Sequence, residues 1–590
     1  MNLVDEIFQP YAEGQAAVLL SDRSLLDLEI DETDRKLRPA VEILRREARR
    51  RHGMLCVTYS LAGGVDWQSE SLSQKDRSSV EAELRRHGFL DVPQDEREVV
   101  RIMRAIASLA RTRTDGLTWS DGGPLRFAFL VQFAEHLMPC REHGNGQTQE
   151  QLVVSELAHL TVQSLSLRAS GHYVMFHGDG AMVDTLVLSA LHHVRVKQPG
   201  ESQKLAFLRV ARSIYTDARF EQGLEDDGVA HLTANTPNRG LESLLRASHR
   251  KQSAISVADL FAQKARDVEQ LSEGTLTLLD PSSVESSDFA GINTSHAQSV
   301  LRRLSDGLLR EDRNLPANVL LAGPPGTGKT QLAQMTARDA RVAAYTMNSP
   351  KGPLVGMTER LARQQQALLR QWTPNVAVCD EITEALPLER SDYDGDSGAS
   401  RAVMAQLLTS LADEGRRGKA LLVATTNCPW RIGTAMRSRF TVVPVLHPLA
   451  ADFPAIIAAL LCRIEPASSV PADDEAVLAA AALFFEKGAN PRHIRSSLNN
   501  ALLLRGHLDR EAVVFAARDF CESGDRLSAE YADYWAIKCC SSLSLLPWSA
   551  APTTYDYPSH LRGVVNEATG EIRHDELDRR IADLRQHANL

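Results

Sequence analysis

The chain has 590 residues, of which 43% are hydrophobic and 24% are charged, and its formal net charge at pH 7 is −10. This composition is that of a soluble globular protein with room for about three to five domains. The net negative charge argues against a protein that binds nucleic acid over its whole surface, although a local basic channel is compatible with it.

The sequence shows no sign of export or membrane insertion. The first residues, MNLVDEIFQPYAEG, lack a basic segment followed by an apolar core, so we expect no secretory signal. No run approaches the roughly 18 apolar residues of a membrane-spanning helix. The eight cysteines show no C-x-x-C or Cys/His spacing, which argues against zinc. We therefore expect a protein of the reducing cytoplasm with no membrane partner.

Residues 1–270 contain no motif that points to a reaction. We expect a helix-rich N-terminal subdomain over 1–140, because segments such as 35–52 place apolar residues at helical spacing. The polar, glycine-containing stretch CREHGNGQTQE (140–150) predicts a loop, and a second subdomain follows over 150–270. No internal repeat of fixed period is visible. We interpret the region as an input or recognition module.

Two groups of polar side chains in this region allow a functional interpretation and a plainer one. Arginines crowd between positions 45 and 51, where they either contact nucleic acid or, as we favour, cover a solvated helix face. The histidines share no recognised ligand spacing, so we expect core or solvated residues rather than metal ligands. They are His172, His177, His192 and His193.

The segment LLAGPPGTGKT (320–330) predicts a buried strand, a glycine-rich turn and the start of a helix. Gly326 and Gly328 lack a Cβ, so the backbone can aim its N–H groups at phosphate oxygens. The positive end of the new helix adds to that anion site. Lys329 is expected to reach the β- and γ-phosphates, and the Thr330 hydroxyl to bind Mg²⁺. The spacing G-x-x-x-x-G-K-[ST] is matched by Gly323, Gly328, Lys329 and Thr330.

A second predicted core strand ends in two carboxylates. The apolar run NVAVC leads into Asp380 and Glu381, about 50 residues after the GKT motif. A carboxylate beside the phosphate loop can hold hydrated Mg²⁺, and the next one can orient and polarise the attacking water. We therefore assign Asp380 to the metal and Glu381 to water activation.

Three later segments supply further candidate catalytic residues. The predicted strand ALLVATTN ends at Asn427, which either bonds the water or γ-phosphate or only forms a turn. In TAMRSRF, Arg437 and Arg439 either project toward a neighbouring subunit's γ-phosphate or form an ordinary surface pair. Arg492 lies in the first turn of a predicted helix, where it can fold back onto the phosphates.

Together these residues resemble the AAA+ ATPases, and more narrowly the AAA clade, over roughly residues 288–520. The motifs are Walker A GPPGTGKT, Walker B VAVCDE, the sensor-1 strand ending at Asn427 and the arginine segment RSRF. The resemblance implies an α/β fold, with a P-loop module of parallel sheet and flanking helices over 288–448 and a helical lid over 449–525. It also implies ATP and Mg²⁺ as cofactors and a homo-oligomeric ring, expected to be a hexamer.

The resemblance extends to binding residues outside these motifs. DFAGI is similar to the clade's entry segment, which assigns Gly291 and Ile292 to the adenine pocket. Pro325 and Thr327 belong to the loop around the nucleotide. KGPLVGMTER is similar to the first pore loop, whose residues facing a threaded polypeptide are here Leu354, Val355 and Gly356.

The sequence departs from the clade's pattern in three places. RSRF is shorter than the usual R-P-G-R-F, and we favour Arg439 over Arg437 as the arginine that acts on the neighbouring subunit. Arg492 resembles a sensor-2 arginine, which the narrow clade commonly lacks. Leu354 stands where polypeptide-threading members carry an aromatic residue, and leucine lacks the flat face that wedges between side chains.

The remaining segments flank this module. Residues 271–287 have the serine, glycine and proline content of a linker. Residues 526–590 form a C-terminal extension, in which GVVNEATGEI predicts a short hairpin and the last residues a helix.

The sequence predicts a Mg²⁺-dependent ATPase, and three hypotheses describe its work. We favour a machine, expected to be hexameric, that remodels or translocates a protein client recruited by its N-terminal region. The alternatives are a nucleotide-controlled switch or scaffold and a nucleic-acid-remodelling ATPase, for example in bacterial defence. The nucleic-acid reading needs basic residues facing the pore, and KGPLVGMTER offers only Lys351 and Arg360 nearby.

Overall fold

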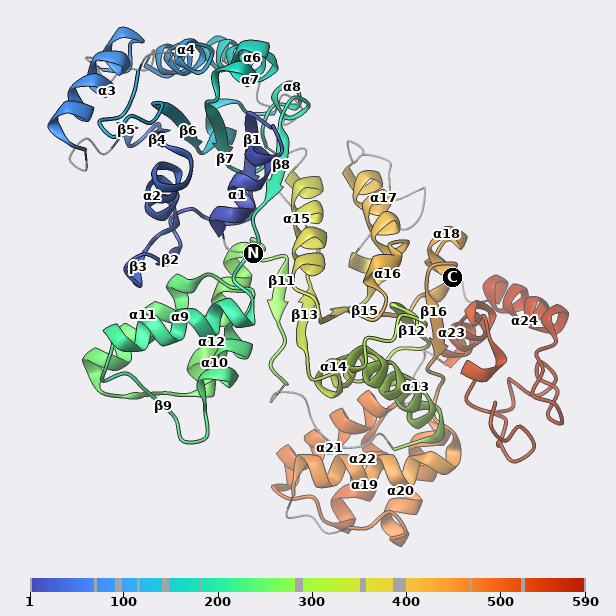
Figure 1. The fold of residues 1–590 in the computed structure, drawn as a ribbon. Helices are drawn as coiled ribbons and strands as arrows, with labels where there is room; N and C mark the ends of the chain where they lie inside the picture. Colours follow the sequence, from blue (N-terminus) through green and yellow to red (C-terminus); the bar gives the residue numbers. More distant parts are fainter. Residues whose placement is uncertain are drawn as a thin grey trace. The chain divides into compact units, whose positions relative to one another are not determined.

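The computed structural model describes residues 3–67, 72–90, 98–113, 117–140, 148–180, 182–281, 290–350, 357–385, 399–466, 470–521 and 526–587. The chain divides into two compact units, one mainly of residues 1–267 and the other mainly of residues 268–590. Each unit has its own six-stranded sheet (Figure 1).

The sheet of the second unit forms from the apolar runs that the sequence predicts as buried strands. All residues of β12 (Asn318–Ala322), β14 (Asn375–Cys379) and β15 (Ala420–Thr426) are buried. The strand order is β11-β13-β14-β15-β12-β16, with β13 (Ala343–Met347) and β16 (Thr441–Pro444) parallel to the buried strands. Strands of a parallel sheet covered on both faces read as continuous apolar runs, as these do.

Helices connect and cover these strands. They are α13 (Ile292–Leu309), α14 (Lys329–Asp339), α15 (Met357–Gln371), α16 (Ile382–Ala385), α17 (Ala399–Leu411) and α18 (Thr434–Arg437). Val319, Leu321, Leu332, Val376 and Val423 belong to one buried cluster between the strands and these helices. The predicted α/β class and its parallel sheet flanked by helices are confirmed.

One edge strand lies inside the segment that the sequence predicts to be a linker. Within residues 271–287, β11 (Leu276–Leu278) pairs antiparallel with β13. The alternation of threonine and leucine in TLTLL explains the strand, because Leu276 and Leu278 turn to the buried side while Thr277 is exposed.

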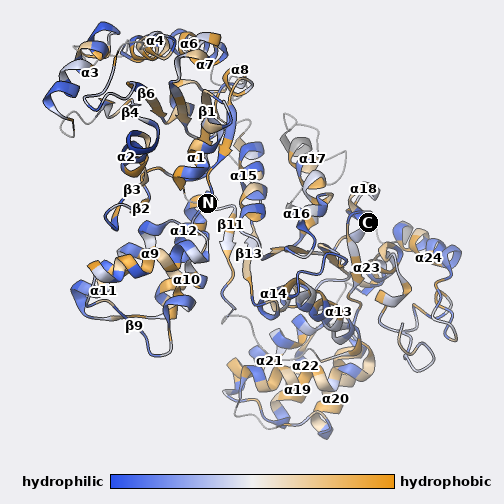
Figure 2. Cartoon of the chain, in the orientation of Figure 1, coloured by the Kyte–Doolittle hydropathy of each residue, from blue (hydrophilic) through white to orange (hydrophobic). Residues whose placement is uncertain are grey.

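Four helices follow the sheet, as the predicted helical lid requires. They are α19 (Phe453–Ile464), α20 (Glu475–Glu486), α21 (Pro491–Arg505) and α22 (Arg510–Asp519). Phe453, Ile457, Phe484 and Leu498 are buried in the core between them. Figure 2 shows hydrophobic residues along these helices.

Aromatic rings pack against one another within the C-terminal extension. The extension contains α23 (Arg526–Cys539) and α24 (His574–His587), and the predicted hairpin is present as an antiparallel bridge between Val565 and Ile572. Between these elements the rings of Trp548, Tyr555 and Tyr557 lie with centroids 4.9–5.5 Å apart.

The N-terminal unit contains a sheet that the helix-rich prediction did not include. Its order is β5-β4-β6-β7-β1-β8, and all neighbours are parallel except β5. The strands are β1 (Ala17–Ser21), β4 (Met54–Ser60), β5 (Gly64–Asp66), β6 (Arg126–Gln132), β7 (Tyr173–His177) and β8 (His192–Arg195). Because β1 pairs with β7 and β8, the predicted subdomains 1–140 and 150–270 contribute strands to one sheet. The break expected at 140–150 therefore does not divide the sheet.

The helices of this unit begin with α1 before the first strand and continue between the strands and after them. The first set is α1 (Leu3–Ala12), α2 (Ala40–His52), α3 (Gln74–Arg86), α4 (Glu98–Ala110), α5 (Ala134–Leu137), α6 (Gln149–Gln163), α7 (Leu165–Ser170) and α8 (Thr185–Leu188). The second set is α9 (Glu201–Ile214), α10 (Asp226–Thr233), α11 (Asn238–Lys251) and α12 (Val257–Leu271). Between β1 and α2 lies a hairpin of β2 (Leu28–Asp31) and β3 (Lys36–Pro39), and β9 (Arg219–Phe220) pairs with β10 (Ala254–Ile255).

The two sheets have the same topology. Numbered by their order along the chain, the five parallel strands of each sheet lie side by side as 2-3-4-1-5. In each unit an antiparallel edge strand pairs with strand 2, and a segment of four helices comes next after strand 5, α9–α12 in the first unit and α19–α22 in the second. The fold thus repeats although the sequence shows no repeat of fixed period.

Other expectations concern single side chains and membrane segments. No helix of the described ranges is long and apolar enough to cross a membrane. The described residues contain no group of three or more His, Cys, Asp or Glu placed to hold a metal.

His172 is a buried core residue whose Nδ1 accepts a hydrogen bond from the Phe127 amide at 3.0 Å, and burial lowers its pKa to about 4. All eight cysteines are free thiols.

Replacing Trp548 by alanine is expected to loosen the C-terminal extension. The indole is 1% exposed and donates a hydrogen bond to the Gly570 carbonyl at 3.0 Å. Loss of a buried tryptophan costs about 3 kcal/mol or more. Amide hydrogens of residues 548–573 should then exchange about a hundredfold faster in the folded state, as measured by mass spectrometry. Leu543→Ala, at a side chain that is 49% exposed, is the matched control and should leave exchange unchanged.

Candidate active site

The glycine-rich turn joins β12 to α14 and has a backbone that larger residues cannot adopt. Gly326 has a φ of +80°, and a Cβ there would lie 2.6 Å from the Asn490 side chain. A Cβ on Gly323 would lie 2.1 Å from the Val445 carbonyl oxygen. Glycine is therefore required at both places, and the turn ends at Gly328, which caps α14.

Lys329 lies under this turn and is 4% exposed. Its Nζ donates hydrogen bonds to the carbonyl oxygens of Gly323 at 2.9 Å and Pro324 at 2.6 Å. Burial lowers the pKa of the ammonium group, because its charged form loses contact with water. The two carbonyl oxygens accept hydrogen bonds from Lys329 as phosphate oxygens would. A phosphate would also add negative charge, which stabilises the charged ammonium group.

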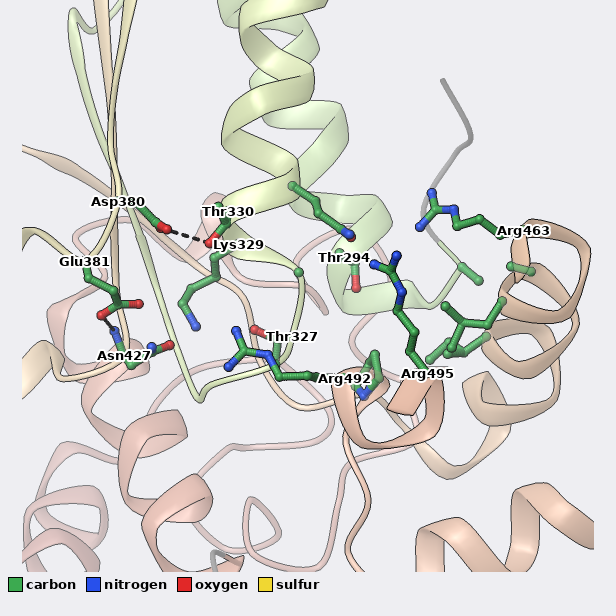
Figure 3. A pocket seen from close by; sticks show the side chains of 18 residues that line it. Thr294, Thr327, Lys329, Thr330, Asp380, Glu381, Asn427, Arg463, Arg492 and Arg495 are labelled. Atoms are coloured by element: carbon green, nitrogen blue, oxygen red, sulfur yellow. Dashed lines mark hydrogen bonds between the residues drawn. The ribbon is translucent and has the colours of Figure 1, made fainter. Parts of the chain in front are cut away.

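Asp380 joins two neighbouring segments at the carboxyl end of β14. Its Oδ1 accepts hydrogen bonds from the Thr330 hydroxyl at 2.8 Å and from the Thr425 hydroxyl at 2.6 Å. Thr330 is the second residue of α14, and Thr425 lies in β15. The structure thus places the two predicted metal ligands, Thr330 and Asp380, in direct contact (Figure 3).

Glu381 follows with an unusual backbone conformation, a φ of +46°, immediately before α16. Its amide donates to the Thr425 hydroxyl at 3.0 Å, and its Oε2 accepts from the Asn427 amide at 3.1 Å. Burial raises the pKa of this carboxyl group, while the Asn427 hydrogen bond acts in the opposite direction. A carboxylate fixed in this way has the position and basicity that polarising a water molecule requires.

These residues open onto one cavity of about 420 Å³, which is the size of a small-molecule site. The polar end carries Lys329, Thr330, Asp380, Glu381 and Asn427. The other end is lined by apolar side chains of the lid and the entry segment: Ala290, Ile456, Ala459, Leu460 and Pro491. A hydroxyl and a carboxylate that contact each other beside an open polar cavity fit Mg²⁺, which takes few protein ligands and fills its octahedron with water and phosphate oxygens.

The helical lid closes one side of the cavity. Asn490, which caps α21, donates through Nδ2 to the Pro325 carbonyl at 3.4 Å. Three lid arginines line the cavity: Arg463, Arg492 and Arg495. Figure 3 shows Arg492 directed toward Lys329 and Thr327, and Arg495 beside Thr294. The lid therefore presents positive charge to the same space as the phosphate loop.

Some predicted binding residues lie beside the cavity rather than in its wall. Ala290 and Thr294 line it, whereas Gly291 and Ile292 between them do not. The Ile292 amide donates to Asp452 Oδ1 at 3.2 Å, which fixes the entry of α13. Pro325 contributes its carbonyl to the lid contact and is not part of the cavity lining.

The predicted arginine pair is also outside this cavity. Arg437 lies in α18 with its guanidinium 5.9 Å from the Trp535 ring centroid, and Arg439 donates to the Ala435 carbonyl at 2.6 Å. Neither lines the cavity of its own chain. The predicted pore-loop residues Leu354, Val355 and Gly356 lie outside the described residues.

Sequence reasoning missed several residues of the site, among them Thr425, Arg463 and Arg495. Thr425 was overlooked because its role depends on the register of two parallel strands, in which Cys379 lies opposite Ala424. Arg463 and Arg495 were overlooked because the lid has to be placed before its side chains can be assigned to the cavity. A signal existed for Arg495, which follows Arg492 by three positions and therefore shares its helix face.

Comparisons with known proteins agree with this site. Residues 319–446 match the family described as ATPase family associated with various cellular activities (AAA). The "ATPase family gene 2 protein" of Saccharomyces cerevisiae is 34% identical over 124 residues, which are 21% of this chain and 16% of that protein. "Proteasome-activating nucleotidase 2" of Halobacterium salinarum is 28% identical over 251 residues, covering 40% of this chain and 58% of that protein.

A solved structure aligns with a longer part of the chain. The FIGL-1 AAA domain in complex with ADP covers 47% of this chain and 97% of its own length, with 21% identity and a TM-score of 0.37. The curated relatives are matched over less than two thirds of their own lengths. The similarity to these two relatives therefore covers only part of each of them.

Replacing Thr425 by valine is expected to lower turnover without removing the site. Valine keeps the shape but leaves Asp380 and the Glu381 amide without a shared partner. We expect kcat for ATP to fall about tenfold or more, because catalytic groups displaced by a fraction of an ångström lose much of their effect. Affinity for ADP measured without Mg²⁺ should stay within a factor of about two, since the phosphate loop is intact.

Thr426→Val is the matched control for this prediction. Thr426 is equally buried on the same strand, but its hydroxyl bonds Thr383 and the Cys428 amide instead. Thr426→Val should lower the melting temperature of the protein but should have little effect on kcat for ATP. Equal losses of kcat in the two variants would contradict the positioning role of Thr425.

Proposed function

The chain contains an ATPase domain of the AAA family, over residues 319–446, and from this premise we propose that the protein hydrolyses ATP to ADP and phosphate with Mg²⁺. The observation that carries the proposal is the contact of Asp380 with Thr330 beside Lys329 and Glu381, all facing one cavity. The phosphate-binding lysine, the candidate metal ligands and the candidate base are then present in one place.

Binding would use both ends of the cavity. The apolar end, with Ile456 and Leu460, suits a purine base, and the turn around Gly326 suits the phosphates. Lys329 would exchange its loop carbonyl partners for phosphate oxygens. Arg492 and Arg495 would approach the phosphates from the lid, so that lid position depends on the nucleotide.

Hydrolysis would use the side chains that follow β14 and β15. Thr330 and Asp380 would hold Mg²⁺, which when bound offsets the negative charge of the phosphate oxygens. Glu381 would accept a proton from the attacking water, because its Oε2 is held by the Asn427 amide and its Oε1 remains directed at the cavity side. The Asn427 side chain, which also lines the cavity, would orient the water or the γ-phosphate.

We further propose that the active assembly is a ring, expected to be a hexamer. Arg437 and Arg439 do not line the cavity of their own chain, which supports a role at the site of a neighbouring subunit. The work of the ring on a protein client recruited by the N-terminal region, and its location in the cytoplasm, remain proposals. Free thiols at all eight cysteines favour a reducing compartment.

A specific observation favours the protein-remodelling hypothesis over the nucleic-acid one. The formal net charge of −10 gives no broad attraction to phosphate backbones. One relative, which is matched over 58% of its own length, is called a proteasome-activating nucleotidase. For that protein the name indicates work on proteins. The switch or scaffold hypothesis differs because it requires nucleotide binding but not repeated ATP hydrolysis.

Replacing Glu381 by glutamine should separate binding from hydrolysis. Glutamine keeps the size of the side chain but cannot accept the water's proton, so kcat should fall by about a hundredfold or more. The affinity for ATP·Mg²⁺, measured with a fluorescent analogue, should change less than about threefold. Lys329→Ala should instead lose both binding and hydrolysis.

The exposed carboxylate Glu384 in the same segment supplies a matched control, and Glu384→Gln should hydrolyse ATP at the wild-type rate. A wild-type kcat in Glu381→Gln would show that Glu381 is not the catalytic base. Measurable ATP affinity in Lys329→Ala, equal to that of the wild type, would overturn the site as a whole.

A mixing experiment tests the shared active site. Arg439→Ala and Lys329→Ala should each be inactive alone, because one lacks the arginine and the other the phosphate-binding lysine. In mixed assemblies a Lys329→Ala subunit offers an intact Arg439 to a neighbour with an intact Lys329, so ATPase activity should reappear. Arg437→Ala, tested in the same way, decides between the two arginines. Absence of recovery for both arginine variants, in assemblies shown by light scattering to be mixed, would contradict a ring with shared sites.

A further inference from the structure

The repeated topology raises the question of what occupies the place of the active site in the N-terminal unit. In the second unit the turn between strand 1 and its helix holds the phosphate loop. In the N-terminal unit the same connection joins β1 to α2 and comprises residues 22–39, which contain no glycine. It forms the β2–β3 hairpin instead of a compact glycine turn.

The first two amides of the helix that follows this connection are already bonded within the chain. Pro39 precedes α2, whereas Gly328 precedes α14. The Ala40 amide donates to the Asp27 carbonyl at 2.8 Å, and the Val41 amide donates to the Leu25 carbonyl at 2.8 Å. The donors that bind phosphate at a helix N-terminus are here used by the chain itself.

The two carboxylates of the active site are also replaced. Glu381, with a φ of +46°, lies immediately before α16, and Phe133, with a φ of +55°, lies immediately before α5. Each residue follows strand 3 of its sheet, so the backbone conformation repeats while the side chain differs. Gln132 and Phe133 therefore occupy the positions of Asp380 and Glu381, and neither can accept a proton from water.

A buried carboxylate of the N-terminal unit occupies the junction between its sheet and its four-helix segment α9–α12. Asp27, 4% exposed, accepts hydrogen bonds from the Asn238 and Arg239 amides, at 3.1 and 3.0 Å, and so caps α11. The Arg23 guanidinium, equally buried, pairs with Asp27 at 3.0 Å. An anion between a helix N-terminus and an arginine is the arrangement that a nucleotide phosphate would make.

Further contacts hold the same junction. The fully buried Lys204 of α9 donates to the Pro237 carbonyl at 3.0 Å, at the start of α11. Leu28, Ile30 and Leu37 of the β2–β3 hairpin pack against the hydrophobic core of α9–α11. The hairpin that replaces the phosphate loop therefore attaches the helical segment to the sheet by apolar contacts, and the neighbouring Asp27 adds hydrogen bonds to the α11 amides.

We infer that the N-terminal unit is a second copy of the nucleotide-binding module in which Asp27 and the β2–β3 hairpin take the place of the nucleotide. This copy binds no ATP, and its helical lid is held closed by the chain itself. Because the anion is covalently part of the chain, the lid contact does not follow the ATP cycle. The N-terminal unit is then a constant scaffold, while α21 of the second unit responds to nucleotide.

Nucleotide stoichiometry and hydrogen exchange test this inference on the full chain. Binding of ATP·Mg²⁺ to Glu381→Gln, measured by equilibrium dialysis, should saturate at no more than one nucleotide per chain. Lys329→Ala should retain no saturable binding. Saturating nucleotide should slow amide exchange in residues 491–505 and leave residues 238–251 unchanged.

Asp27→Asn tests the lid contact directly. An uncharged amide cannot satisfy both the helix amides and Arg23, so exchange in residues 238–251 should rise at least tenfold with the ATP affinity unchanged. Asp226→Asn is the matched control, since it removes only the partly exposed pair with Arg212 and should leave exchange in 238–251 unchanged.

The outcomes separate this inference from the proposed ATPase function. More than one nucleotide per chain in Glu381→Gln would overturn the inference and leave the ATPase intact. Unchanged exchange in Asp27→Asn would also overturn it. Absence of any nucleotide binding by the Glu381→Gln chain would overturn the proposed function, while the Asp27→Asn experiment would still decide the inference.

Discussion

The Asp380 carboxylate connects the parts of this active site. It accepts hydrogen bonds from Thr330 of α14 and Thr425 of β15, and it follows β14, so three segments distant in sequence meet at one oxygen. This meeting depends on the parallel sheet, because only parallel strands bring their carboxyl ends to one edge. One strand order, 2-3-4-1-5, therefore brings together the phosphate loop, the proposed metal ligands and the proposed proton acceptor.

The same strand order carries a different set of side chains in the N-terminal unit. There the connection after the first strand is a hairpin, and the anion at the lid helix is Asp27 instead of a ligand. A bound nucleotide contributes stability only while it is present, whereas an internal ion pair with its helix cap contributes at all times. The two units thus illustrate how one fold can serve as a responsive module and as a fixed one, the distinction lying in the residues at a single edge of each sheet.

Much of the second unit was predictable from the sequence, and little of the first. Lys329, Asp380 and Glu381 were identified because phosphate and metal chemistry tolerate few residue types at those positions. Thr425 was missed because its role arises from strand register. The lid arginines were missed because their roles arise from the tertiary placement of the lid. The sheet of the N-terminal unit escaped prediction because its motif positions carry Pro39, Gln132 and Phe133, which mark no phosphate or metal chemistry. A fold can be repeated when volume and hydrophobic pattern are kept, even where every residue that marks the motif has changed.

A cryo-electron microscopy structure of Glu381→Gln saturated with ATP and Mg²⁺ tests the central claim most directly. The account predicts nucleotide density in the cavity between Lys329, Asp380 and the lid helix α21. It predicts none between β1 and α11, where Asp27 should remain bonded to the Asn238 and Arg239 amides. Nucleotide density at the second place, or an empty cavity at the first, would contradict the account.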